Sequence, residues 1–215
     1  MIVVLTGAPG AGKGTQADLL AAKEGFRKVS TGDALRKHVR MKSPIGLQAE
    51  AVMARGELVS DEILFEILRE ELGPDSGERI LLDGYPRNVA QAKTLDSLKE
   101  THPVVAAIHL DVDAGELVNR LSGRRVCGNC GATYHVTLTP SKTAGVCDKC
   151  GGLLQQRADD REDSVRTRLS VYESTTKPVL EYYRGKGLYQ RVDGLGSTEE
   201  VFGKLKGSLS GVKFR

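Results

Sequence analysis

"MIVVLTGAPGAGKGTQ", residues 1–16, joins an apolar run to a glycine-rich turn that ends in a lysine. Residues 1–5 predict a buried strand, and a helix is expected from about Gly12 to Lys23. Glycines let the backbone curl so that successive N–H groups point at phosphate oxygens, while the helix N-terminus and Lys13 add positive charge. A purely structural glycine turn is the alternative. The order of strand, G-x-x-x-x-G-K and helix favours a phosphate-binding loop.

Gly14 stands where such loops usually carry a Ser or Thr hydroxyl that binds Mg²⁺. Without that hydroxyl, the metal must be held mainly by nucleotide oxygens and water, which suits the reluctance of Mg²⁺ to lose its waters. Thr15 can still reach a phosphate through its hydroxyl and N–H. Asp83 closes the apolar run 79–83 and is placed to anchor the metal's waters, although a simple strand-end cap would also explain it.

Further apolar runs alternate with helical patterns along the chain. Strands are expected at 27–30, 79–83, 104–110 and 188–192. A helix is expected after Ser60, with a stop at Gly73–Pro74, and "STEE" at 197–200 is typical of a capping box. This alternation predicts an α/β fold, a P-loop NTPase-type parallel sheet flanked by helices. Residues 30–59 form a candidate insertion that is largely helical.

All four cysteines lie in two pairs, "CGNC" at 127–130 and "CDKC" at 147–150. They fall within 123–160, where Gly, Cys, Thr and Pro replace the apolar period, so a second inserted domain ordered by a metal is expected. Four thiolates leave no open coordination position, which favours one structural Zn²⁺ over a catalytic one. An iron–sulfur cluster and a redox pair are the alternatives. The expected ligands are Cys127, Cys130, Cys147 and Cys150.

The composition argues against several function classes. The 215 residues carry a net charge of +3, aromatic residues make up 5%, and there is no Trp. These values give no reason to expect binding to a membrane or a polynucleotide, although "GRRVC" beside the thiolates keeps a zinc-ribbon nucleic-acid module as a rival. A GTPase switch is disfavoured because the chain has no Asn-Lys-x-Asp segment. The start of the chain resembles no signal peptide, so a cytoplasmic protein is expected.

One arginine can be placed by periodicity. Val165, Leu169 and Tyr172 form a helical stripe that includes Arg168. An arginine among inward-facing apolar residues is costly unless it meets an anion, and extension of its head to solvent is the alternative. Arg161 shares the stripe, and we expect it to form a structural ion pair.

Five segments together resemble the adenylate kinases of the long, zinc-containing bacterial type. They are "GAPGAGKGT" (7–15), "STGDALR" (30–36), "LLDGYPR" (81–87), "GRR" (123–125) and "RADDRED…RTR" (157–168), in the family's order. The resemblance implies a monomeric nucleoside monophosphate kinase that interconverts ATP, AMP and ADP with Mg²⁺. It also implies a core of 1–29, 60–122 and 161–215, a monophosphate-binding insertion at 30–59 and a zinc-bearing lid at 123–160.

The resemblance assigns residues to each nucleotide. On the ATP side it implies Gly10, Ala11, Gly12, Lys13, Gly14, Thr15, Arg120, Arg124, Thr133 and Tyr134. On the AMP side it implies Thr31, Arg36, Glu57, Leu58, Val59, Gly84, Tyr85, Pro86, Arg87, Gln91, Arg157 and Arg168. The catalytic set is Lys13, Asp83, Arg87, Arg120, Arg124, Arg157 and Arg168. Thr31 and Gln91 match the AMP-using pattern, and a UMP/CMP kinase is the alternative within the enzyme class. His135 is expected to be a lid residue that contacts solvent or nucleotide.

Overall fold

The computed structural model describes residues 1–74 and 77–214. Its centre is a parallel sheet of five strands in the order β2–β3–β1–β4–β8. The strands are β1 (Ile2–Gly7), β2 (Arg27–Ser30), β3 (Ile80–Asp83), β4 (Val104–Asp111) and β8 (Tyr189–Asp193). The expected parallel sheet is confirmed, and the strand bounds differ from the predicted ones by at most two residues.

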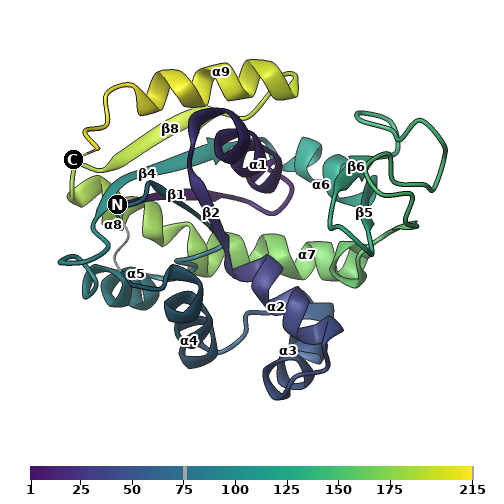
Figure 1. Ribbon diagram of the computed structural model, residues 1–215, viewed down its shortest axis with the longest axis horizontal. Coiled ribbons are helices and arrows are strands. Elements are labelled where there is room, and N and C mark those ends of the chain that lie inside the picture. Colours follow the sequence, from purple (N-terminus) through teal and green to yellow (C-terminus); the bar gives the residue numbers. More distant parts are fainter. Residues whose placement is uncertain (75–76, 215) are drawn as a thin grey trace.

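Helices cover both faces of the sheet (Figure 1). The side chains of β1 alternate between the two layers, because Ile2 and Val4 join one hydrophobic cluster and Val3 and Leu5 the other. Helices α1 (Lys13–Glu24) and α9 (Thr198–Leu209) contribute to the cluster of Val3. Helices α4 (Asp61–Leu72), α5 (Val89–Asp96) and α8 (Pro178–Gly185) contribute to the cluster of Ile2.

The predicted helix ends are present. Ser60 caps α4 by accepting a hydrogen bond from the N–H of Ile63, and Gly73 follows its last residue. Ser197 and Glu200 form the expected capping box at the start of α9. No helix in the described part of the chain is both long enough and apolar enough to span a membrane.

Two further segments extend from the sheet domain (Figure 1). Within 30–59 the chain forms α2 (Thr31–Arg40) and α3 (Pro44–Ala54), which pack against each other. Helix α6 (Ala114–Ser122) leads into a small antiparallel sheet of the order β6–β5–β7, made of β5 (Arg124–Cys127), β6 (Thr133–His135) and β7 (Leu154–Gln155). The chain enters and leaves this second segment at adjacent points, since the Gln156 amide donates to the Ser122 carbonyl over 3.3 Å.

A long helical stretch returns the chain from the small sheet to the sheet domain (Figure 1). It consists of a 3₁₀ turn (Ala158–Asp160), α7 (Glu162–Val171), a π-helical turn (Tyr172–Thr176) and α8. Pro178 has no N–H to continue the α-helical ladder. The ladder widens just before it, where the Lys177 N–H donates to the Tyr172 carbonyl over 2.8 Å.

Candidate active site

A cavity of about 1050 Å³ lies at the carboxyl ends of the central strands. Its walls come from the loop after β1, the turn after β3, the start of α2, the small sheet and the loop before α9. Strands β3 and β4 lie on opposite sides of β1, so β1 ends where the sheet order reverses. Parallel α/β sheets bind ligands at such a reversal.

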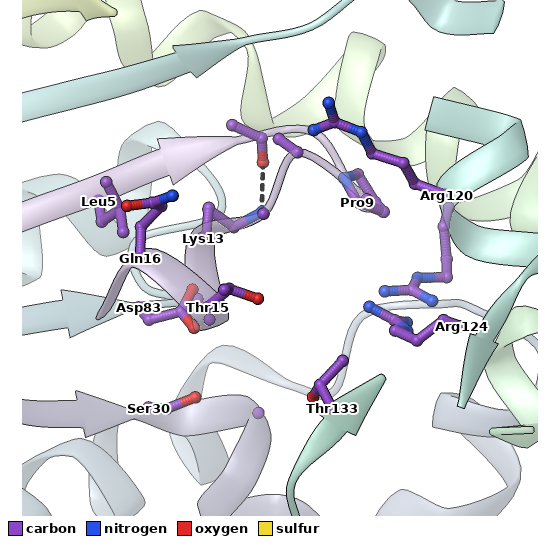
Figure 2. A pocket seen from close by; sticks show the side chains of 18 of the residues that line it. Leu5, Pro9, Lys13, Thr15, Gln16, Ser30, Asp83, Arg120, Arg124 and Thr133 are labelled. Atoms are coloured by element: carbon purple, nitrogen blue, oxygen red, sulfur yellow. Dashed lines mark hydrogen bonds between the residues drawn. The ribbon is translucent and has the colours of Figure 1, made fainter. Parts of the chain in front are cut away.

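The loop after β1 has the geometry of a phosphate cradle. Gly7 has a φ of 149°, and a Cβ there would lie 2.7 Å from the Leu110 carbonyl oxygen, so only glycine fits. Lys13 begins α1 and folds back over the loop, where its Nζ donates to the carbonyls of Gly7 (2.7 Å) and Ala8 (3.0 Å) (Figure 2). The pKa of Lys13 is lowered to about 8, chiefly by burial; Asp83 opposes this shift and the neighbouring arginines add to it.

Asp83 lies beside this loop at the end of β3 (Figure 2). A Cβ built on Gly14 would be 3.8 Å from the Asp83 carboxylate, so the position without a side chain faces the carboxylate. Carboxylate oxygens are ligands or water anchors for Mg²⁺. The residues therefore fit a hydrated magnesium ion carried in with a nucleotide.

Six arginines predicted for phosphate binding line the same cavity: Arg36, Arg87, Arg120, Arg124, Arg157 and Arg168. Arg120 and Arg124 face Lys13 and Thr15 across the open space (Figure 2). Burial and neighbouring arginines lower the pKa of Arg87 to about 10 and that of Arg157 to about 9. The cavity therefore brings several partly buried cations together, as a site for a polyanion requires.

Buried carboxylates hold two of these arginines in place. The Asp160 side chain is fully buried and accepts from Arg124 Nε (2.7 Å) and Arg168 Nη1 (2.9 Å). Arg168 also contacts Asp159 at 3.1 Å. By contrast, Nε of Arg157 is buried and has no hydrogen-bond partner among residues 1–74 and 77–214. A buried donor of this kind fits an anionic ligand.

Two of the predicted nucleotide-binding residues do not line the cavity. Thr31 is fully buried and donates from its hydroxyl to the Gly84 carbonyl over 3.0 Å. Gln91 is 1% exposed, donates to Asp61 over 2.7 Å and accepts from the Arg87 N–H over 2.6 Å. Both side chains brace the turn 84–87, whose Arg87 does reach the cavity. Every other residue predicted for the two nucleotides lines it.

The four cysteines meet at the end of the small sheet. Their Sγ atoms lie within 4.8 Å of one another, with Cys127 and Cys150 at 3.4 Å and Cys130 and Cys147 at 3.6 Å. Four thiolates around Zn²⁺ at about 2.3 Å place the sulfurs ~3.8 Å apart, so the cluster fits that ion. Only thiols form the group among the described residues, which leaves no ligand set typical of a catalytic zinc.

Two expectations for single residues change. Arg161 is exposed and forms no ion pair with any described residue, so its predicted ion pair is wrong. His135 lies at the cavity wall, but the structure engages both ring nitrogens. Its Nε2 lies 3.2 Å from the Asn119 carbonyl, and its Nδ1 accepts from the N–H groups of Thr137 and Leu138. The ring thereby joins the small sheet to α6.

Sequence reasoning missed three residues that position the site. The first, Asp160, holds Arg124 and Arg168. The second, Asp61, accepts a hydrogen bond from Gln91. The third, Gln16, donates from its buried amide to the Thr198 carbonyl over 3.0 Å. The adjacent acids in "RADD" beside Arg157 were the only available signal for the first. No local pattern marks the other two, because each contact joins distant parts of the chain.

The comparisons with known proteins agree with this geometry. A family model described as adenylate kinase matches residues 5–188. An adenylate kinase of Thermodesulfovibrio yellowstonii is 47% identical over 95% of this chain and 97% of the relative. Those of Geobacillus sp. and Bacillus subtilis are 45% and 44% identical, each over 99% of this chain and 100% of the relative. The family model and these relatives show that this chain belongs to the adenylate kinase family.

Proposed function

We propose that this chain catalyses reversible phosphoryl transfer between ATP and AMP to give two ADP. The observation that carries the proposal is one cavity with a phosphate loop at one end and an arginine cluster beside it. The turn 84–87 and the start of α2 form its other wall. A single site of this kind can hold two phosphate chains end to end.

The chemistry needs positioning and charge neutralisation more than a base. The phosphate of a nucleoside monophosphate is already ionised near neutral pH, so no group has to remove a proton from it. Lys13 and the N–H groups of the loop hold the donor phosphates, and Arg36 and Arg87 hold the acceptor phosphate. Arg124, Arg157 and Arg168 surround the transferring group and stabilise its charge in the transition state. Arg120 belongs to the donor side.

Two metals have separate tasks in this proposal. Asp83 would anchor the waters of a Mg²⁺ ion that enters with ATP, and the ion would neutralise charge on the donor phosphates. Zn²⁺ on Cys127, Cys130, Cys147 and Cys150 is structural. The domain bounds 30–59 and 123–160, a monomeric state and a cytoplasmic location are parts of the same proposal.

Acceptor choice is assigned to the region around Thr31, Gln91 and residues 57–59. Because Gln91 contacts the backbone of Arg87, it couples base choice to the position of the acceptor-binding arginine. UMP or CMP as the preferred acceptor is the competing possibility.

A coupled assay with ATP and AMP, UMP, CMP or GMP tests the proposal. AMP should give the highest kcat/KM, and the reaction should need Mg²⁺. Arg87→Ala should lower kcat by about 10²-fold or more, because it removes charge that acts in the transition state. Arg191→Ala, which removes an exposed arginine paired with Asp111, is the matched control and should leave turnover unchanged. A higher kcat/KM with UMP or CMP would overturn the acceptor assignment.

A further inference from the structure

Tyr134 contacts the thiol cluster and is also a residue of the cavity wall. Tyr134 occupies the middle of β6, and it and Thr133 line the cavity. Its hydroxyl lies 3.5 Å from the Cys147 Sγ and accepts a hydrogen bond from the Asp148 N–H over 2.9 Å. One strand residue therefore touches a metal ligand with its side chain and belongs to the wall of the cavity.

The direction of the hydroxyl bond follows from these partners. The Asp148 N–H can only donate, so the tyrosine oxygen accepts there and its own proton is available for Cys147. A thiolate bound to a metal has lone pairs and no proton, so it accepts that hydrogen bond. The bond reduces the charge left on the sulfur and fixes where the ring lies.

Strand β6 is held by its pairing with β5 and by the side chains of Tyr134 and His135. It is three residues long and pairs with β5, with Tyr134 opposite Arg125. Just before it, the Cys127 N–H donates to the Ala132 carbonyl over 2.9 Å. The His135 ring holds the end of β6 to α6, and the Tyr134 contact joins the middle of β6 to the second thiol pair.

We propose that Tyr134 is a positioning residue that couples the metal centre to the donor-nucleotide wall. Its hydroxyl stabilises the Cys147 thiolate on the metal and holds β6 at the cavity. The effect of Tyr134 on the nucleotide wall rests on the proposed function (the coupling half), while its effect on the metal does not (the metal half). Because coupling between two binding sites is reciprocal in free energy, bound ATP should raise the affinity for the metal by the same factor by which the metal raises the affinity for ATP. Slower metal release in the presence of ATP is the expected kinetic sign of this coupling.

Zinc release from the full-length, zinc-loaded chain tests the metal half. Tyr134→Phe removes only the hydroxyl and should speed release to a chromophoric chelator by about 10-fold or more, the usual range for loss of a partner to a metal ligand. Tyr182→Phe is the matched control, because it removes the hydroxyl that contacts Asp96, outside the small sheet. Equal release rates for the parent chain and Tyr134→Phe would overturn the proposal.

Mg²⁺-saturated ATP tests the coupling half. ATP should slow zinc release from the parent chain and should have a smaller effect on Tyr134→Phe. If ATP binds, as shown by a separate titration, but protects both proteins equally, the coupling is overturned. Failure of ATP to bind the parent chain in that titration would count against the proposed function instead.

Cobalt substitution gives a readout that loss of stability alone would not move. In the Co²⁺-loaded protein, removal of a hydrogen bond to sulfur makes the thiolate easier to oxidise. The sulfur-to-cobalt charge-transfer band should therefore shift to longer wavelength in Tyr134→Phe. ATP should perturb this band in the unmodified chain, which tests the coupling even where the variant does not fold. An unshifted band in both experiments would contradict the proposal.

Discussion

At the scale of single residues, Asp160 illustrates how a buried carboxylate organises cations. Its side chain is fully buried, while those of Arg124 and Arg168 are 17% and 18% exposed. The loss of one partner from such a group leaves charges that nothing compensates, which costs about 3–5 kcal/mol. The placement of two arginines of the cavity wall thus depends on a carboxylate that does not itself line the cavity.

Asp160→Asn should therefore lower both stability and turnover. The amide keeps the shape but loses the charge, so Arg124 and Arg168 lose their fixed positions. We expect a fall in kcat of about 10²-fold, together with a lower melting temperature. Asp193→Asn, which removes an exposed partner of Lys204, is the control and should leave stability and turnover nearly unchanged. Unchanged turnover in Asp160→Asn would contradict the positioning role.

Lys13 gives the protein a predicted dependence on pH. Its pKa is lowered to about 8, chiefly by burial, so the ammonium loses its proton as the pH rises through that value. Donor binding should weaken above about pH 8, and kcat/KM for ATP should fall while AMP is kept saturating. Bound phosphates raise the pKa of Lys13, so kcat should fall only at higher pH. A flat kcat/KM profile up to pH 10 would rule out Lys13 as the titrating donor contact.

The sequence could predict the residues that line the cavity better than those that position them. The glycines within 7–14, Lys13 and the arginines form local sequence patterns that are typical of phosphate binding. Gln91 also has a local pattern, but its partner Asp61 comes from another helix, so its orientation depends on packing. His135 shows the same limit, because the carbonyl it contacts belongs to α6.

At the scale of helices and strands, local patterns predicted the sheet domain and its helix caps. Apolar runs bounded by turn residues give strands, and Ser60 and Ser197 give helix starts. The order β2–β3–β1–β4–β8 has no local signal, because it arises from the way helices cross over the sheet. The short strands of the small sheet were not predicted, since β7 has only two residues and the thiol cluster orders the segment.

Metal removal should therefore affect the small sheet first. The segment 123–160 has too few buried apolar residues to fold by burial alone, so Zn²⁺ should supply its folding free energy. Cys127→Ser with Cys130→Ser, or chelation in mild denaturant, should unfold this segment, lower the melting temperature and reduce activity. The sheet domain should keep its structure.

Metal analysis should find one zinc per chain. Protein purified without chelator that lacks zinc, and whose four thiols all react freely in the native state, would contradict the structural role of the metal.

At the scale of the whole molecule, the cavity lies between parts that belong to different segments of the chain. The sheet domain supplies the loop after β1, α2 with Met53 and residues 56–59 supplies one wall, and the small sheet supplies another. Phosphoryl transfer has to exclude water, since otherwise ATP is hydrolysed. Closure of the two outer segments over bound nucleotides would provide this exclusion.

A dinucleotide that spans both nucleotide positions should make the protein more compact. Hydrogen exchange should slow in 30–59 and 123–160, and small-angle scattering should show a smaller radius of gyration. The central strands, which are already buried, should change little. Identical exchange in the two outer segments with and without the dinucleotide would contradict closure.

The contact between Gln156 and Ser122 also bears on how such a protein can change over generations. An inserted segment whose two ends meet can be lengthened, shortened or replaced without rerouting the surrounding chain. The segment 123–160 can therefore change as a unit during evolution. In one lineage, other interactions can replace the four thiolates and still stabilise the same fold. Such changes would leave the fold of the central sheet intact, because neither of its two hydrophobic clusters includes a residue of 123–160.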